Sequence, residues 1–263
     1  MGGRFGLRHA NAAAVASPPF STVHPEPARR IVEDQIIRRV QHHAAASRYE
    51  DLEFRNCTFE SCNLGQTGPD PGDRSYVRNV RLIRCTFRQA AIGPVVLEDV
   101  VVDRPLLRYG SVQPFLRALA FNRVILRGPV NALVFVVPAE YDLANHKRGD
   151  AFRKWNARFY ETVEWAIDIS EASFSTIEFR PGIPARLIRR DPTTQVVIRR
   201  DPALAVDWSD NWLPDPSWNI GIEDFLKSGY ADHVLIAARR SPRFDAQLAT
   251  IARLREMGVA DPD

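Results

Sequence analysis

The sequence has no long apolar run and few of the residues that form crosslinks. No stretch of about 18 apolar residues occurs, so we expect no membrane-spanning helix. No continuous apolar segment follows Arg4 and Arg8 near the N-terminus, which argues against a secretory signal. The three cysteines are odd in number and lack zinc-ligand spacing. A disulfide framework is therefore not expected, and a reducing bacterial cytoplasm is the predicted location.

The common catalytic motifs are also missing. The chain contains no G-x-S-x-G, Walker, H-E-x-x-H or G-x-G-x-x-G sequence. Asp168, Glu171 and Glu178 alternate with apolar residues, as carboxylates do on polysaccharide-cleaving β-helices, but no second pair accompanies them. His42 and His43 are adjacent, and neighbouring helical residues point in different directions. We expect no catalytic residue, no cofactor and no metal.

Lysine is scarce, at positions 147, 154 and 227 only, so arginine supplies almost all of the positive charge. The formal net charge of +3 argues against an acidic DNA mimic and does not require a nucleic-acid partner. Arginine forks suit phosphate and carboxylate groups. The codon usage of a GC-rich genome explains the same bias without any binding role.

A repeat is the clearest feature that the sequence does contain. Residues 52–65, LEFRNCTFESCNLG, recur as residues 80–93, VRLIRCTFRQAAIG, at an offset of 28. Within each copy a small residue, a polar residue, a large apolar residue and two polar residues follow one another. The small and large positions are two apart, so both face the same side of an extended segment. Stacked copies would bury a continuous apolar column.

These residues resemble the pentapeptide-repeat proteins, whose pattern is a small residue, Asp or Asn, Leu or Phe, and two polar residues. CTFESCNL matches well, and CTFRQAAI matches fairly. The resemblance implies a mainly β fold, a right-handed parallel β-helix or solenoid with about four pentapeptides in each coil. The offset of 28 then equals one coil of about 20 residues plus an excursion at residues 66–75. Small inward positions hold Cys57, Cys62 and Cys85, which we expect to pack as small apolar residues.

The 263 residues allow one elongated repeat domain or two small domains. We predict a disordered tail at 1–25 and a solenoid at 26–182, with a capping helix from Pro27 to about Ala46 and an inserted helix near 150–165. Asp150 is the expected N-cap of the inserted helix. The segment 104–118 contains two prolines and is expected to bulge out. Residues 183–263 are predicted to form a small α/β appendage or a cap on the far end.

The C-terminal part contains the strongest candidate surface. LIRRDP at 187–192 is echoed by VIRRDP at 197–202, and each is typical of a strand that ends at Asp-Pro. If the two strands pair, their arginines cluster on one edge, and an aromatic segment follows them. The alternatives are a salt-bridged solvated edge and an aromatic core. The predicted partner-binding residues are Arg186, Arg189, Arg190, Arg199, Arg200, Trp208, Trp212 and Trp218.

The sequence favours a non-enzymatic bacterial scaffold that binds another protein, with an immunity or antitoxin role as one form of it. This expectation rests on the long rigid face of repeat proteins and on analogy at the level of the fold. One alternative is a carbohydrate-active or carbohydrate-binding β-helix. A second is a nucleic-acid binder that uses the arginine edge.

Overall fold

Strands dominate the structure, a computed structural model in which 41% of the described residues are strand and 26% are helix. The fold is mainly β, with parallel sheets and a few helices. No helix among the described residues is long and apolar enough to cross a membrane. The predicted tail at 1–25 lies outside the described residues, which are 29–40, 46–64, 71–108, 115–117, 119–136, 146–179, 182–208 and 213–261.

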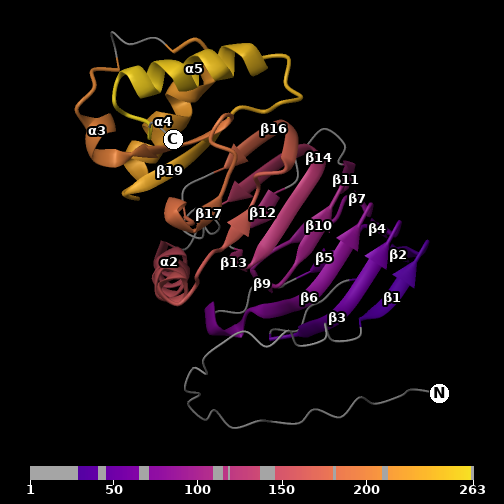
Figure 1. The fold of residues 1–263 in the computed structure, drawn as a ribbon. Coiled ribbons are helices and arrows are strands. Elements are labelled where there is room, and N and C mark those ends of the chain that lie inside the picture. The colour runs from indigo at the N-terminus through magenta and orange to yellow at the C-terminus, as the bar shows by residue number, and fades with distance from the viewer. Residues whose placement is uncertain are drawn as a thin grey trace, which may run out of the picture.

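Parallel ladders organise the N-terminal two-thirds of the chain (Figure 1). Ladder A stacks β1 (Arg30–Glu33), β3 (Arg48–Arg55), β6 (Ser75–Ile83), β10 (Val101–Asp103) and β14 (Val124–Val136). Ladder B stacks β2 (Ile36–Arg38), β4 (Thr58–Glu60), β7 (Thr86–Arg88) and β11 (Leu106–Arg108). Ladder C stacks β5 (Asn63–Leu64), β8 (Ala91–Ile92), β12 (Phe115–Arg117) and the end of β14.

Shorter strands complete the stack. β9 (Val95–Glu98) pairs with the start of β6, and β13 (Ala120–Asn122) pairs with β9, which makes ladder D. β15 (Ile167–Asp168) and β16 (Ala172–Phe179) pair with β14, and β17 (Ile188–Arg189) pairs with β15. The chain passes through ladders A, B, C and D in the same order each time, and we call one pass a round.

The register of ladder B follows the sequence repeat. Phe59 pairs with Phe87, at the predicted offset of 28, and Phe87 pairs with Leu107, 20 residues later. The round from β7 to β11 therefore takes 20 residues, and the round from β4 to β7, which includes residues 65–70, takes eight more. The segment 104–118 was expected to bulge out. Its described parts continue the ladders instead, β11 in ladder B and β12 in ladder C, and residues 109–114 and 118 lie outside the described residues.

The backbone turns between ladders at residues with positive φ, five residues apart. Asn56, Ser61, Arg84 and Gln89 have φ between 51° and 53°. Each of them directly precedes a small inward residue, in the order Cys57, Cys62, Cys85 and Ala90. A small side chain is required there because the turn brings two ladders together. The local sequence thus fixes both the corner and the inward column.

The predicted capping helix between Pro27 and Ala46 is wrong. Within its described residues, 29–40, the chain forms β1 and β2 instead. Val32 and Ile37 are five residues apart and pair with Phe54 and Phe59 of the following round. This segment therefore continues the five-residue pattern, and its partial helical spacing is coincidental.

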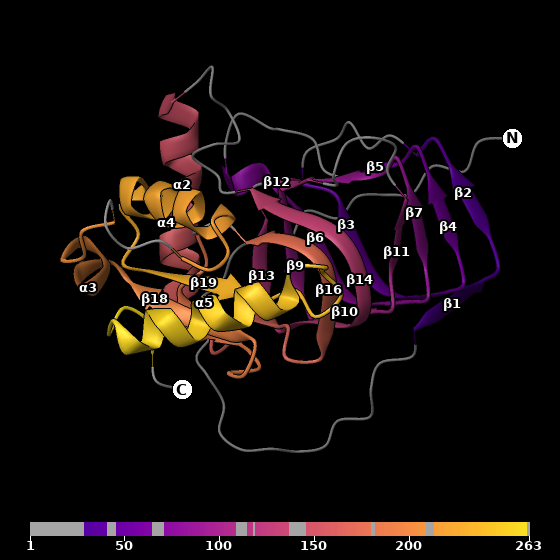
Figure 2. The same cartoon turned by 90° about the horizontal axis from the view of Figure 1, so that it is seen from above.

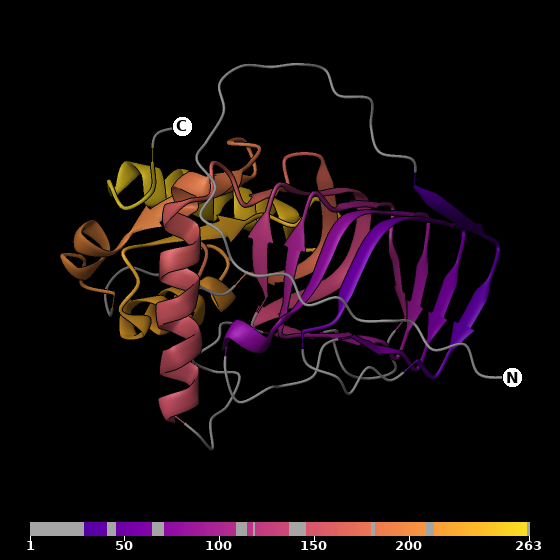
Figure 3. The same cartoon turned by 90° about the horizontal axis from the view of Figure 1, so that it is seen from below.

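The inserted helix is confirmed as α2 (His146–Glu161), which begins four residues before the expected cap at Asp150. Asp150 instead forms an ion pair with Arg153, at 2.6 Å, within the helix. Figures 2 and 3 show α2 beside the strands, on the side of the stack where the C-terminal elements also lie. Phe152 and Tyr160 are buried on the side of α2 that faces the stack.

A small α/β unit follows η2 (Ala185–Leu187). β18 (Gln195–Arg199) and β19 (Asp232–Ile236) pair antiparallel. The helices α3 (Arg200–Leu204) and α4 (Ser217–Ser228) lie between the two strands in the sequence, and α5 (Phe244–Glu256) follows β19. Val197, Val234 and Ile236 join the apolar core of the ladders. The opposite side chains of the two strands, including Val196 and Ile198, pack against the helices. These elements lie at the end of the stack away from β1 and β2 (Figure 2).

Candidate interaction surface

The predicted arginines do not share one edge in the way that the sequence suggested. β17 pairs with β15 and β18 pairs with β19, so the two RRDP strands do not pair and the condition for one arginine edge is not met. Arg190 and Arg199 do converge, on the carboxylate of Asp261, at 3.9 Å and 3.0 Å. Arg189 lies over the ring of Trp165, with 4.2 Å between Cζ and the centroid. The RRDP repeat is thus divided between the ladder stack and the antiparallel sheet.

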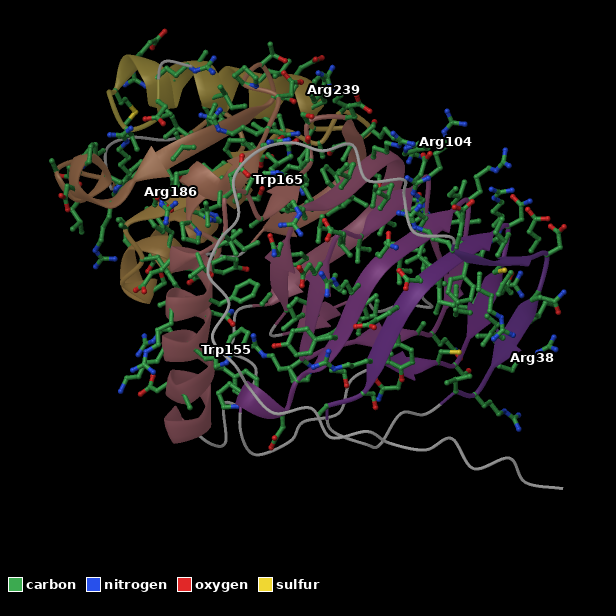
Figure 4. The ribbon with its side chains drawn as sticks, turned by 60° about the horizontal axis from the view of Figure 1, so that its bottom comes forward. Arg38, Arg104, Trp155, Trp165, Arg186 and Arg239 are labelled. Atoms are coloured by element: carbon green, nitrogen blue, oxygen red, sulfur yellow. The ribbon has the colours of Figure 1, made fainter. Side chains whose placement is uncertain are left out.

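The other two predicted arginines differ from each other. Arg186 is exposed on η2 (Figure 4), whereas Arg200 is partly buried at the start of α3. The backbone N–H of Arg200 donates to the carbonyl of Ala231, at 2.9 Å. Arg186 therefore faces solvent, and Arg200 helps to join α3 to the segment before β19.

The predicted tryptophans that the structure describes belong to the C-terminal core. The indole of Trp208 donates to the carbonyl of Ala203, at 2.8 Å, and its ring packs against the helices. Trp218 on α4 is buried in the same core. Trp212 lies outside the described residues. The aromatic-core alternative accounts for the positions of Trp208 and Trp218.

The three cysteines are free thiols at the predicted small inward positions. Cys57 and Cys85 have no solvent exposure and lie in one apolar cluster with Phe87 and Ala90. Burial raises the pKa of the Cys85 thiol to about 11. Among the described residues, no group of three His, Cys, Asp or Glu side chains is placed to hold a metal ion.

The carboxylates considered for glycoside chemistry are engaged locally. Asp168 accepts hydrogen bonds from the backbone N–H and the hydroxyl of Ser170, at 3.0 Å and 2.6 Å. Glu171 is exposed at the turn before β16, while the side chain of Glu178 lies outside the described part. Asp168 therefore stabilises the turn between β15 and β16.

An apolar cavity of about 220 Å³ lies inside the first rounds. Its walls come from residues on and between the strands β2 to β8, among them Leu52, Phe59, Val80, Phe87 and Ile92. These side chains point into the core, so the cavity is a part of the core that they do not fill completely. It offers apolar surface and almost no polar group.

The outer surface of ladder B has a concentration of arginine. Arg84, Arg88, Arg104 and Arg108 are exposed on two successive rounds, and we call them the arginine face. Arg88 and Arg108 are direct partners in the register of β7 and β11. Arg104 follows Arg84 by the same 20 residues. Figure 4 shows Arg104 projecting outward from the strands.

The backbone holds these four side chains on a rigid lattice. Neighbouring strands are about 4.8 Å apart, and four residues along a strand span roughly 13 Å. Arg84 and Arg104 occupy corner positions with φ of 52° and 51°. A Cβ at Gly128, on the next round, would lie 2.6 Å from Cγ of Arg104, so the absence of a side chain at Gly128 leaves space for Arg104.

Three of the four side chains of the arginine face have no ion-pair partner among the described residues. Within the described residues, Arg84, Arg88 and Arg108 form no ion pair, and Arg104 approaches only Asp103, at 3.8 Å. Asp103 is shared, since Arg127 binds it at 3.1 Å. On ladders A, B and D other arginines are paired, as in Arg55–Glu33, Arg38–Glu60 and Arg123–Asp99.

The sequence reasoning missed this face although a signal for it exists. Residues 84–88 read RCTFR and residues 104–108 read RPLLR, so two arginines recur at an offset of 20. The two prolines of the segment 104–118 hide this offset, because proline is not expected in the repeat. Pro105 in fact occupies the small inward position, where it is buried.

Comparison of the chain with protein-family models, with curated proteins and with solved structures found no match.

Proposed function

We propose that this protein is a binding scaffold built on a right-handed β-solenoid, and that its arginine face binds an acidic surface of a partner protein. In this proposal each round is one coil of the solenoid. The parallel register, the 20-residue round and the corner residues spaced by five support it. The observation that carries the binding function is the exposed stack of four arginines, of which only Arg104 has an ion-pair partner, Asp103, among the described residues.

The stacked arginines cost stability in the free protein. Like charges opposite one another in a ladder repel, and Arg88 and Arg108 are such a pair. Arg84 and Arg104 also hold positive φ, which Asn or Asp adopts at lower cost. A structural role would favour the alternating charges that are present elsewhere on the surface. Binding to an acidic surface offsets the repulsion and explains the clustering.

Arginine on a rigid lattice suits carboxylate recognition in particular. The guanidinium group presents parallel N–H donors that match the two oxygens of a carboxylate. The strands hold the four Cα positions before binding, so little backbone ordering is required. Complementary charge would also raise the association rate and make it sensitive to salt.

A partner protein fits this face better than a nucleic acid does. Nucleic-acid binding draws most of its affinity from many phosphate contacts along an extended basic surface. Here the four arginines cover two rounds, and the net charge of the whole chain is only +3. An acidic patch of a protein matches that limited area. An immunity role is one form that such binding could take.

The test compares affinity capture from lysate of the source organism by three forms of the full chain. These are the natural protein, the variant Arg88→Ser/Arg108→Ser, and the matched control Arg186→Ser/Arg240→Ser, whose arginines are also exposed. We expect an acidic protein bound by the natural and control forms and lost from the face variant. With the purified partner, the face variant should bind at least about tenfold more weakly by calorimetry.

Two outcomes would count against the proposal. A partner that binds all three forms equally would remove the arginine face from the interaction. Salt-sensitive binding of a short DNA or RNA duplex that depends on Arg88 and Arg108 would instead identify a nucleic-acid surface. Circular dichroism of the face variant and of the control establishes that both retain the fold.

A further inference from the structure

Arg74 is a buried cation at the junction of the strands and the inserted helix. It follows η1 (Pro71–Asp73) and directly precedes β6, and only 1% of its surface is exposed. Its guanidinium Cζ lies 4.7 Å from the ring centroid of Phe152 and 4.5 Å from that of Trp155, both on α2. Figure 4 shows Trp155 on the side of α2 that faces the strands.

The polar contacts of Arg74 leave most of its donors unused. Nη1 donates to Oδ1 of Asn156, at 2.6 Å, and that amide in turn donates to the carbonyl of Leu119, at 3.4 Å. Within the described residues, Nε and Nη2 of Arg74 have no acceptor, and the neighbouring hydroxyl of Ser75 is also buried without a partner. A buried donor without an acceptor costs about 1–3 kcal/mol, and more when the group is charged.

No carboxylate of the described residues pairs with this cation. The aromatic rings offer a cation–π attraction, and Asn156 and Tyr160 are neutral. Burial lowers the pKa of Arg74 to about 10, so the guanidinium remains charged at neutral pH. A buried charge is ordinarily paired. The site is therefore short of one negative charge.

The two unused donors form one complete edge of the guanidinium. Nε–H and the adjacent N–H of Nη2 point the same way, which is the fork that receives two oxygens of one carboxylate or phosphate group. Asn156 occupies the other edge, and the rings of Phe152 and Trp155 cover its surface. The arrangement is a preorganised half of an oxyanion site.

We propose that Arg74 is the centre of a binding site for a small oxyanion, a carboxylate or a phosphate group, held by its Nε–Nη2 edge. The bound anion would neutralise the cation and accept the unused hydrogen bonds. Since Phe152, Trp155 and Asn156 all belong to α2, the ligand would also tighten the attachment of α2 to the strands. This site does not depend on the arginine face or on a partner protein.

The test measures the melting midpoint of the full chain in sodium acetate, sodium phosphate and sodium chloride at equal ionic strength. The variants are Arg74→Met and the control Arg240→Met, which makes the same substitution at an exposed arginine outside the arginine face. General effects of these salts act on all three proteins alike. We expect an additional rise of about 5 °C at a hundredfold excess over Kd in the natural and Arg240→Met proteins, absent from Arg74→Met.

Tryptophan fluorescence keeps the proposal testable if Arg74→Met does not fold. The ring of Trp155 touches the guanidinium, so a bound anion should change its emission along a saturating curve, and Trp155→Phe should lose that change. Response to acetate alone would identify a carboxylate site, and response to phosphate alone a phosphate site. Responses that rise without saturation, or that persist unchanged in Arg74→Met, would overturn the site.

Discussion

The ring of Phe59 stacks on the ring of Phe87, with 5.2 Å between centroids and 8° between the ring planes. The two residues are separated by 28 positions and are direct partners in ladder B. Beside them the backbone N–H of Thr86 donates to the carbonyl of Cys57, at 2.8 Å. The cysteines and phenylalanines of the repeat therefore stack on successive rounds, as the sequence predicts. Each set of stacked side chains forms a continuous column inside the ladders.

Replacing Phe87 with Ala should lower the free energy of unfolding by about 3–5 kcal/mol, because it removes a buried ring from this column. The void would join the apolar cavity that Phe87 already lines. The measurement is the midpoint of urea denaturation. Thr86→Ala, one residue away on the outward side, should change the stability by less than about 0.5 kcal/mol. Equal effects of the two changes would mean that the inward register is wrong.

How far the sequence predicts the fold depends on whether a segment repeats. Cys57-x-Phe59 and Cys85-x-Phe87 are two good copies, so their register could be read directly. Val32 and Ile37 belong to the same columns, but their round has no similar copy, and a helix was predicted instead. Local pattern alone does not separate these possibilities when few inward positions are apolar.

The surface and the buried site were predicted less well, for different physical reasons. The arginine face follows from the register at an offset of 20, once Pro105 is recognised as an inward residue. The contact of Arg74 with Asn156 joins residues 82 apart in the chain. It depends on how α2 packs against η1, which no periodicity encodes. The RRDP repeat does not place its arginines on one edge, because its two copies pair with different strands.

Gly128 should tolerate no side chain. Its φ of +78° is in the left-handed region, and an added Cβ would collide with Cγ of Arg104. We expect Gly128→Ala to destabilise the protein by about 1–3 kcal/mol, as measured by thermal unfolding. Gly221, in α4, has no atom within 4 Å of the corresponding Cβ position and a helical environment. Gly221→Ala should therefore raise the free energy of unfolding by about 0.5–1 kcal/mol. An equal loss of stability in both variants would contradict the positive φ and the close contact with Arg104 at Gly128.

His233 should make the stability depend on pH below neutrality. Burial beside the ring of Phe225 lowers its pKa to about 3, from an ordinary value near 6.5. The unfolded chain then binds a proton below about pH 6.5 that the folded chain does not. Stability is complete above that pH and falls as the pH drops toward 3, by about 1.4 kcal/mol for each unit from this group. Denaturation midpoints between about pH 5 and 7.5 measure the slope.

The variant His233→Gln provides the control for this slope. It removes the titrating group while the position stays neutral, so the part of the slope due to His233 should disappear above about pH 5. The carboxyl of Asp191 changes the stability only at lower pH. Hydrogen bonds from Thr193, Thr194 and Arg239 outweigh its burial and lower its pKa to about 2, so its stabilisation is lost only as the pH falls below its ordinary value of 3.8. An unchanged slope in His233→Gln would show that other groups are responsible.

The three thiols should differ in reactivity because Cys57 and Cys85 are buried in one inward column, whereas Cys62 lies at the next corner and is partly exposed. Cys57 and Cys85 have no exposure, and the raised pKa of Cys85 disfavours the reactive thiolate further. Cys62 is partly exposed near the edge of the early rounds. Titration with a thiol-specific reagent should therefore show one fast thiol in the native protein and three in denaturant. Cys62→Ser should abolish the fast phase, whereas Cys57→Ser should leave it in place. A fast phase that survives Cys62→Ser would mean that the rounds open often enough to expose the inner column, and the rigid lattice that the arginine face requires would then fail with it.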